Sequence, residues 1–293
     1  MEPHAHGRSG DEFDWAGMVA YAELEAELLA AFLAEAASEL AVVSERDGID
    51  VRRILDIGSG PGVGTCALAT QFPSATVMAA DGSPEMLANV VARAERLGLG
   101  ARVTTRLVEL PDGLDDLDRA DAIWASMVLH HVGDEAAALR GLRRRLEPGG
   151  LVALAEFGDP TRFLPAGADL GRPGVWERLD AAGADWLAGM RAALPGATVS
   201  GDYPTMLAEA GFSLLTDRVM TVHLDAPLDD RARRLARAHL QMLRQHVGTR
   251  AEPDDLAVID RLTDDDNPAG VMQRPDALLR ASRRLLVARA VAP

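Results

Sequence analysis

Hydrophobic positions along the chain change their period near residue 50. Before that point, from Trp15 to about Val43, apolar residues recur at the spacing of one helix face. The members of this series are Trp15, Met18, Leu24, Leu28, Phe32 and Leu40. The pattern predicts two amphipathic helices, or one helix with a break, at the start of the chain.

After residue 50, short apolar runs alternate with helical patterns. The runs predict strands over residues 51–57, 75–80, 103–108, 121–126 and 151–157. The intervening patterns predict helices over 61–72, 84–97 and 134–146, with Asp134 as the N-cap of the last. Residues 147–150, Glu-Pro-Gly-Gly, are expected to form a turn. Strands that alternate with helices in this way indicate a parallel sheet covered by helices.

The second half of the chain is less regular. Its patterns predict helices over 176–194, 203–210, 228–248 and 254–263, and strands over 212–224 and 283–291. Long insertions between sheet elements tend to form lids or substrate walls. We therefore expect a single domain over 1–293, with a flexible tail (1–12), an N-terminal helical cap (13–48), a cofactor-binding core (50–157), helical substrate lids (159–200 and 226–280) and a last strand (281–291).

Composition narrows the class of protein. The chain has 293 residues and a net charge of −15, and all 30 basic residues are arginine. An acidic chain repels phosphate backbones and anionic lipid, so we expect no nucleic acid and no membrane as partner. The single cysteine, Cys66, suits a reducing compartment. With neither a signal-peptide pattern nor a long apolar stretch in this sequence, the expected location is cytoplasmic.

The stretch RILDIGSGPGVGT, residues 53–65, carries the first chemical signal. A strand that ends in Gly58-Ser59-Gly60 and opens a helix lets a ligand approach the backbone and the free N–H groups of the helix. Asp81 follows Gly58 by 23 residues, at the end of the next predicted strand. This is the spacing at which a carboxylate reaches a ribose diol, so the ligand is expected to contain a ribose.

Two ribose-containing cofactors fit this loop. A dinucleotide site needs a third glycine at the position that Val63 occupies, and its pyrophosphate would lie near the like charge of Asp56. The ammonium group of S-adenosylmethionine would instead be attracted by Asp56. The residues therefore favour S-adenosylmethionine, and a NAD-dependent oxidoreductase remains an alternative.

The loop resembles motif I of the class I S-adenosylmethionine-dependent methyltransferases. The stretches VMAADGSPEML, RLVELP and ADAIWASMVLHHVGDEAAALRGLRRRLEPGG are similar to later motifs of that family, in the same order. The resemblance implies an α/β Rossmann-like fold, with a doubly wound, seven-stranded, mostly parallel sheet and one antiparallel strand. It implies that Asp81 binds the ribose, Met86 packs on the adenine and Glu109 meets the adenine amino group. The full set of expected cofactor-binding residues is Asp56, Gly58, Ser59, Gly60, Asp81, Gly82, Met86, Glu109, Ser126, Tyr21 and Trp15.

The catalytic candidates lie after the fourth predicted strand. Methyl transfer depends mainly on positioning, and a base is needed only when the acceptor must lose a proton. In some relatives a histidine at the position of His131 assists deprotonation, so His131 is the first candidate for a base or polar anchor and His130 the second. The alternative is that both histidines only pack or cap the loop. No metal site is expected, because His239 and His246 lack a clear third ligand.

The combined expectation is an enzyme that transfers a methyl group from S-adenosylmethionine to a small-molecule acceptor. An arginine-only, alanine-rich composition suggests a bacterial origin and, by analogy, secondary metabolism. A same-fold enzyme that catalyses cyclisation or decarboxylation, and a binding module with a dead site, stay open as alternatives. A homodimer is one further option, because lid helices often pair.

Overall fold

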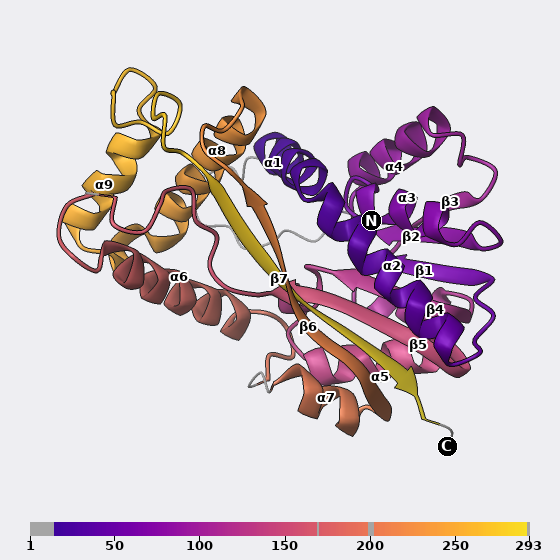
Figure 1. Cartoon of the computed structure of the whole chain (residues 1–293). Coiled ribbons are helices and arrows are strands. Elements are labelled where there is room, and N and C mark those ends of the chain that lie inside the picture. The colour runs from indigo at the N-terminus through magenta and orange to yellow at the C-terminus, as the bar shows by residue number, and fades with distance from the viewer. Residues whose placement is uncertain (1–14, 169, 199–201, 292–293) are drawn as a thin grey trace.

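A seven-stranded sheet forms the centre of the protein (Figure 1). The structure is a computed structural model that describes residues 15–168, 170–198 and 202–291. The strands lie in the order β3-β2-β1-β4-β5-β7-β6. β7 runs antiparallel to both of its neighbours, whereas the other pairs in the sheet are parallel. The predicted Rossmann-like sheet with one antiparallel strand is therefore confirmed.

The strands begin and end close to the predicted residues. They are β1 (Arg53–Ile57), β2 (Thr76–Asp81), β3 (Val103–Leu107), β4 (Ala120–Ser126), β5 (Leu146–Phe157), β6 (Phe212–Leu224) and β7 (Leu279–Ala290). β6 matches the prediction at both ends. The expected turn over residues 147–150 is wrong, because β5 already begins at Leu146, which pairs with Ala120 across a register shift. β7 begins four residues earlier than predicted and pairs there with the end of β6.

Helices cover both faces of the sheet. They are α1 (Trp15–Leu28), α2 (Ala30–Arg46), α3 (Val63–Gln71), α4 (Pro84–Arg96), α5 (Glu135–Arg145), α6 (Val175–Ala192), α7 (Tyr203–Glu209), α8 (Asp230–Val247) and α9 (Pro253–Thr263), with short 3-10 turns η1 (Asp112–Asp116), η2 (Leu129–His131) and η3 (Gly248–Arg250). Buried side chains of α2, α3 and α4 pack on one face, and those of α5 and α7 pack on the other. Within the described ranges, no helix has both the length and the apolar character needed to cross a membrane.

Local chemistry explains where several helices begin. The side chain of Asp134 accepts a hydrogen bond from Ala137 N at 2.8 Å, which confirms it as the N-cap of α5. Ser83 caps α4 in the same way, and Pro84 takes the first helical position, where its missing N–H costs nothing. These two caps fix the chain just after β2 and just before α5, and both points lie beside the candidate site.

A third hydrophobic cluster lies beyond the sheet. It joins buried residues of α6, α8 and α9 with Leu29 and the outer ends of β6 and β7. Figure 1 shows α8 and α9 gathered around the end of the long β6–β7 ribbon, with α1 between α8 and α4. The predicted insertions 159–200 and 226–280 supply these helices, and their role as substrate lids stays a prediction.

Candidate functional site

The glycine loop after β1 and the end of β2 are joined by backbone hydrogen bonds. Gly58 N donates to Ala80 O at 2.7 Å, and Gly60 N donates to Asp81 Oδ2 at 2.9 Å. The other carboxylate oxygen, Oδ1 of Asp81, accepts from Ser83 N at 2.9 Å. The structure therefore holds the Asp81 carboxylate directly beside the glycine loop, where two backbone N–H groups fix its orientation.

The two glycines of this loop, Gly58 and Gly60, have different surroundings. Gly58 has φ +64°, and a Cβ there would lie 2.2 Å from Val128 Cγ2, so a side chain would push the loop after β4 away. Gly60 has φ +52°, and a Cβ there would meet nothing within 4 Å. Of the described polar atoms, Ser59 Oγ is one that is buried and lacks a hydrogen-bond partner. Open space beside Gly60 and an unsatisfied hydroxyl one residue away fit a polar ligand seated on this loop.

Asp56 lies on β1 just before the loop and is 2% exposed. Its Oδ2 accepts a hydrogen bond from Thr65 Oγ1 at 2.6 Å. Burial raises the pKa of this carboxyl to about 7, the Thr65 hydrogen bond lowers it in part, and the charge of Asp81 raises it further. A nearby cation, such as the ammonium group of an amino acid, would stabilise the ionised form of this buried carboxyl group.

The remaining core candidates lie at the same edge of the sheet. A Cβ on Gly82 would lie 3.6 Å from Oε2 of Glu109, so the exposed Glu109 carboxylate stands next to the residue after Asp81. Met86 is half-buried in the first turn of α4, where its N–H donates to Ser83 Oγ at 3.2 Å. Ser126 is the half-buried last residue of β4, which pairs with β1.

His130 is held by a buried carboxylate that the sequence analysis missed. Glu156, on β5, is 1% exposed, and its Oε2 lies 2.8 Å from His130 Nδ1. Its Oε1 accepts from Val128 N at 3.1 Å and from Leu129 N at 2.9 Å. An ionised carboxylate only accepts, so His130 donates through Nδ1 and its Nε2 is left as the basic nitrogen.

His131 lies beside His130 but in a different environment. The centroids of the two rings are 4.1 Å apart, and His131 is exposed, whereas His130 is buried. Desolvation by its neighbours, followed by the charge of His130, lowers the pKa of His131 to about 4. His131 is therefore neutral at physiological pH, and it accepts a proton less readily than an unperturbed histidine.

Helix α6 contacts the same loop. Arg191, in its last turn, donates through Nη1 to His130 O at 3.1 Å and to Glu135 Oε1 at 2.8 Å. Tyr203 OH donates to the same Glu135 oxygen at 3.1 Å. The loop after β4 is thus fixed by Glu156 of β5 and by Arg191 of α6.

Of the two aromatic candidates from the N-terminal segment, only Tyr21 has a described side chain. Tyr21 OH donates to Glu25 Oε1 at 3.2 Å and lies 3.0 Å from His239 Nδ1, and Arg283 Nη2 donates to the same Glu25 oxygen at 3.0 Å. Burial raises the pKa of Tyr21 well above its usual value and lowers that of His239 to about 4. Tyr21 therefore joins α1 to α8, and Glu25 joins α1 to β7. The side chain of Trp15 lies outside the described part of the chain.

Comparison with known proteins shows which family part of the chain resembles. Residues 54–150 match the family model described as "Methyltransferase domain". A trans-aconitate 2-methyltransferase from Methylobacterium radiotolerans is 34% identical over 139 residues, which cover 44% of this chain and 51% of the relative. A malonyl-[acyl-carrier protein] O-methyltransferase from Dechloromonas aromatica is 38% identical over 108 residues, covering 37% of each chain. The chain thus spans about half or less of the length of these curated relatives.

Residues 54–150 therefore resemble the methyltransferase-domain family. Members of this family use S-adenosyl-L-methionine, and the matched segment contains the glycine loop, Asp81 and the histidine loop. The fold agrees with a solved O-methyltransferase family protein from Burkholderia thailandensis, with a TM-score of 0.54 at 14% identity over 96% of this chain and 61% of that one.

The sequence analysis missed three polar residues of the site, Glu156, Thr65 and Arg191. Glu156 stands in the apolar strand segment ALAEF, and a carboxylate inside such a run is a signal that could have identified it. Thr65 and Arg191 carry no such signal, because their partners are set by the tertiary fold. No group of three or more His, Cys, Asp or Glu side chains that could hold a metal occurs among the residues described.

The raised pKa of Asp56 predicts a pH-dependent cofactor affinity. Below about pH 7 the free enzyme carries a protonated Asp56, so binding an ammonium group must release that proton. The affinity for S-adenosylhomocysteine should therefore fall by up to about tenfold for each pH unit below 7, and level off above it. Calorimetry from about pH 6 to about pH 8 measures this slope. Asp56→Asn should remove the slope, and an equal slope in both proteins would assign the titration to another group.

Proposed function

We propose that the protein transfers a methyl group from S-adenosylmethionine to a small organic acceptor and that His130 removes a proton from that acceptor. The cofactor, when bound, supplies a methyl group already activated by its sulfonium charge. The glycine loop and Asp81 would hold its ribose, Asp56 its ammonium group, and Ser59 Oγ would gain the hydrogen-bond partner it lacks within the chain. Positioning of this kind contributes most of the rate in a displacement with an activated donor.

The buried pair of His130 and Glu156 is the observation that supports proton transfer. The Nδ1 contact of 2.8 Å fixes the ring and its tautomer, and the carboxylate stabilises the imidazolium that forms when Nε2 takes a proton. The pKa of His131 is lowered to about 4, and we assign this residue a polar contact with the acceptor. This arrangement favours an acceptor with a protic group, such as a hydroxyl or an amine.

A small acceptor is supported by the lid helices and by the names of two relatives. The end of α6 reaches the histidine loop, where Arg191 donates a hydrogen bond to His130 O. The relatives are named for methylating trans-aconitate and a malonyl group on a carrier protein. Small carboxylic acids therefore belong in any acceptor screen beside phenols, alcohols and amines. The expected place in bacterial secondary metabolism stays a prediction.

The test is a two-step assay on the purified chain. S-adenosylmethionine and S-adenosylhomocysteine should both bind in calorimetry, whereas NAD should not. A panel of small acceptors is then screened for release of S-adenosylhomocysteine together with a product 14 Da heavier, the mass of an added CH₂. If the cofactor binds but the product has the same mass as the acceptor, the enzyme catalyses a reaction other than methylation. If the cofactor does not bind at all, the proposal is wrong.

A further inference from the structure

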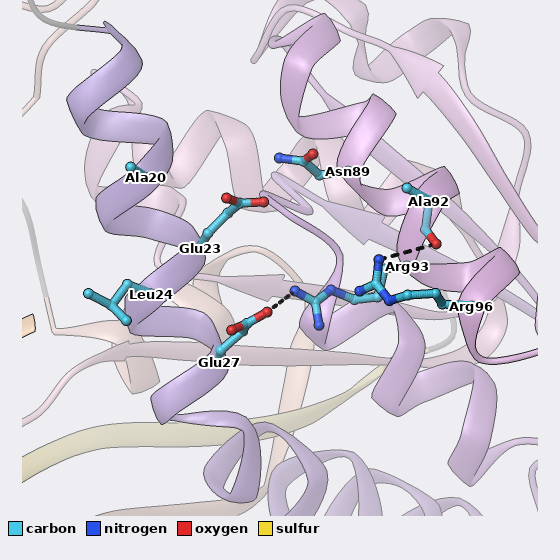
Figure 2. Close-up of a pocket in the computed structure, with 8 residues that line it drawn as sticks. All are labelled: Ala20, Glu23, Leu24, Glu27, Asn89, Ala92, Arg93 and Arg96. Atoms are coloured by element: carbon cyan, nitrogen blue, oxygen red, sulfur yellow. Dashed lines mark hydrogen bonds and ion pairs between the residues drawn. The ribbon is translucent and has the colours of Figure 1, made fainter. Parts of the chain in front are cut away.

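A polar groove separates the cap helix α1 from the core helix α4 (Figure 2). Its volume is about 410 Å³. Acidic side chains, Glu23 and Glu27, line it from α1, and the arginines Arg93 and Arg96 line it from α4. The methyltransferase chemistry described above uses none of these four residues.

Arg93 makes two contacts that join separate parts of the molecule. Its Nη2 lies 2.7 Å from Oε1 of Glu27, and its Nε donates to Pro61 O at 3.3 Å. Pro61 is the residue after Gly60 in the glycine loop. The side chain of Arg93 is only 15% exposed, so one largely buried guanidinium contacts both the cofactor loop and the last turn of α1.

Glu27 also has a second partner. Its other carboxylate oxygen pairs with Arg231 of the lid helix α8. Glu27 is therefore held from the core side by Arg93 and from the lid side by Arg231. The other two charged residues of the groove do not join α1 to α4. Arg96 donates to Ala92 O of its own helix at 3.5 Å. Glu23 points into the groove without an ion pair to either arginine (Figure 2).

We propose that Arg93 is a positioning residue of the cofactor site, which fixes the glycine loop through the Pro61 carbonyl and ties the ordering of α1 to that loop through Glu27. This inference rests on the proposed function, because the glycine loop is taken as the cofactor's seat. Arg93 does not contact the cofactor in this account; it acts through Pro61. Coupling of this kind is reciprocal: if an ordered α1 favours an ordered loop, then a ligand that orders the loop must also order α1.

Because the Arg93 side chain is only 15% exposed, its ion pair with Glu27 is expected to contribute more than a fully exposed pair does. Fully exposed ion pairs contribute little, since solvent screens them and the side chains lose entropy. Hydrogen bonds from a guanidinium to a carboxylate or carbonyl are stronger when water is largely excluded. We therefore expect the loss of Arg93 to weaken S-adenosylhomocysteine binding by roughly fivefold, the effect of one typical hydrogen bond.

The experiment combines calorimetry with hydrogen exchange on the full chain, with S-adenosylhomocysteine as the probe. In the native protein the probe should slow exchange both in the glycine loop and in α1. In Arg93→Gln the affinity should fall by about fivefold, and the probe should slow exchange in the loop but not in α1. Arg96→Gln is the matched control, from the same helix and groove, and should behave as the native protein.

A second pair of variants separates coupling from folding. Glu27→Gln keeps the Arg93–Pro61 contact, so the affinity should fall less than in Arg93→Gln while protection of α1 is lost. Glu23→Gln, one turn away on the same helix, should retain that protection. Equal protection of α1 by the probe in native, Arg93→Gln and Glu27→Gln proteins would overturn the inference. If the native protein fails to bind the probe at all, the proposed function fails instead, so the two failures are distinguishable.

Discussion

Replacing His130 with alanine is expected to lower turnover by about 10²–10⁴-fold, the usual contribution of a general base. Affinity for S-adenosylhomocysteine should stay within about twofold, because His130 lies outside the cofactor cradle. The physical reason is the buried contact with Glu156, which leaves Nε2 of His130 as the nitrogen that accepts the proton. Turnover and calorimetry on the same preparations measure the two quantities, once an acceptor is known.

Two companion variants make this prediction specific. Glu156→Gln should lower turnover and shift the pH profile, since the amide cannot stabilise the imidazolium as a carboxylate does. His131→Ala should lower turnover less than His130→Ala, although the resemblance to the family favoured His131 as the base. If His131→Ala has the larger effect, and His130→Ala retains full turnover, the roles of the two histidines must be exchanged.

Removing the Asp81 carboxylate is expected to weaken S-adenosylhomocysteine binding by about 1–3 kcal/mol, or roughly 5- to 150-fold. Two losses combine in Asp81→Ala. The ribose would lose its acceptor, and the N–H groups of Gly60 and Ser83 would lose the partner that fixes the loop. Calorimetry measures the change in affinity, and circular dichroism checks that the sheet is intact.

The control for Asp81 is Glu85→Gln, which removes a negative charge four residues away. Glu85 is exposed and its side chain contacts Ser83 Oγ at 3.0 Å, outside the glycine loop. Its effect on affinity should be less than about twofold, because exposed charges are well screened. An Asp81→Ala protein that binds as tightly as the native one would remove the ribose role from the account.

The fold was predictable wherever local pattern carries it. Strand β6 was predicted at both ends because turn residues bound its apolar residues, and α5 was predicted through its Asp134 cap. Strand β7 begins at Leu279, earlier than expected, because arginines interrupt its apolar run and hide the pattern. The placement of Asp81 beside Gly60 follows from the parallel pairing of β1 and β2, since parallel strands end at the same edge of the sheet.

The rest of the site depends on contacts between distant residues. Glu156 meets His130 across 26 positions, and Arg93 meets Glu27 across 66. Neither spacing corresponds to a helix or strand period, so only the tertiary fold brings these charges together. Tyr21 illustrates the same limit, because the expected contact with the cofactor came from family resemblance, whereas its hydrogen bond to His239 spans 218 positions.

The most direct test of the central claim is a crystal structure of the protein with S-adenosylhomocysteine. We expect both ribose hydroxyls to lie within hydrogen-bond distance of the Asp81 carboxylate, the amino group of the ligand to face Asp56, and Ser59 Oγ to gain a partner. A ligand bound away from the glycine loop, with Asp81 still bonded only to the backbone, would contradict it.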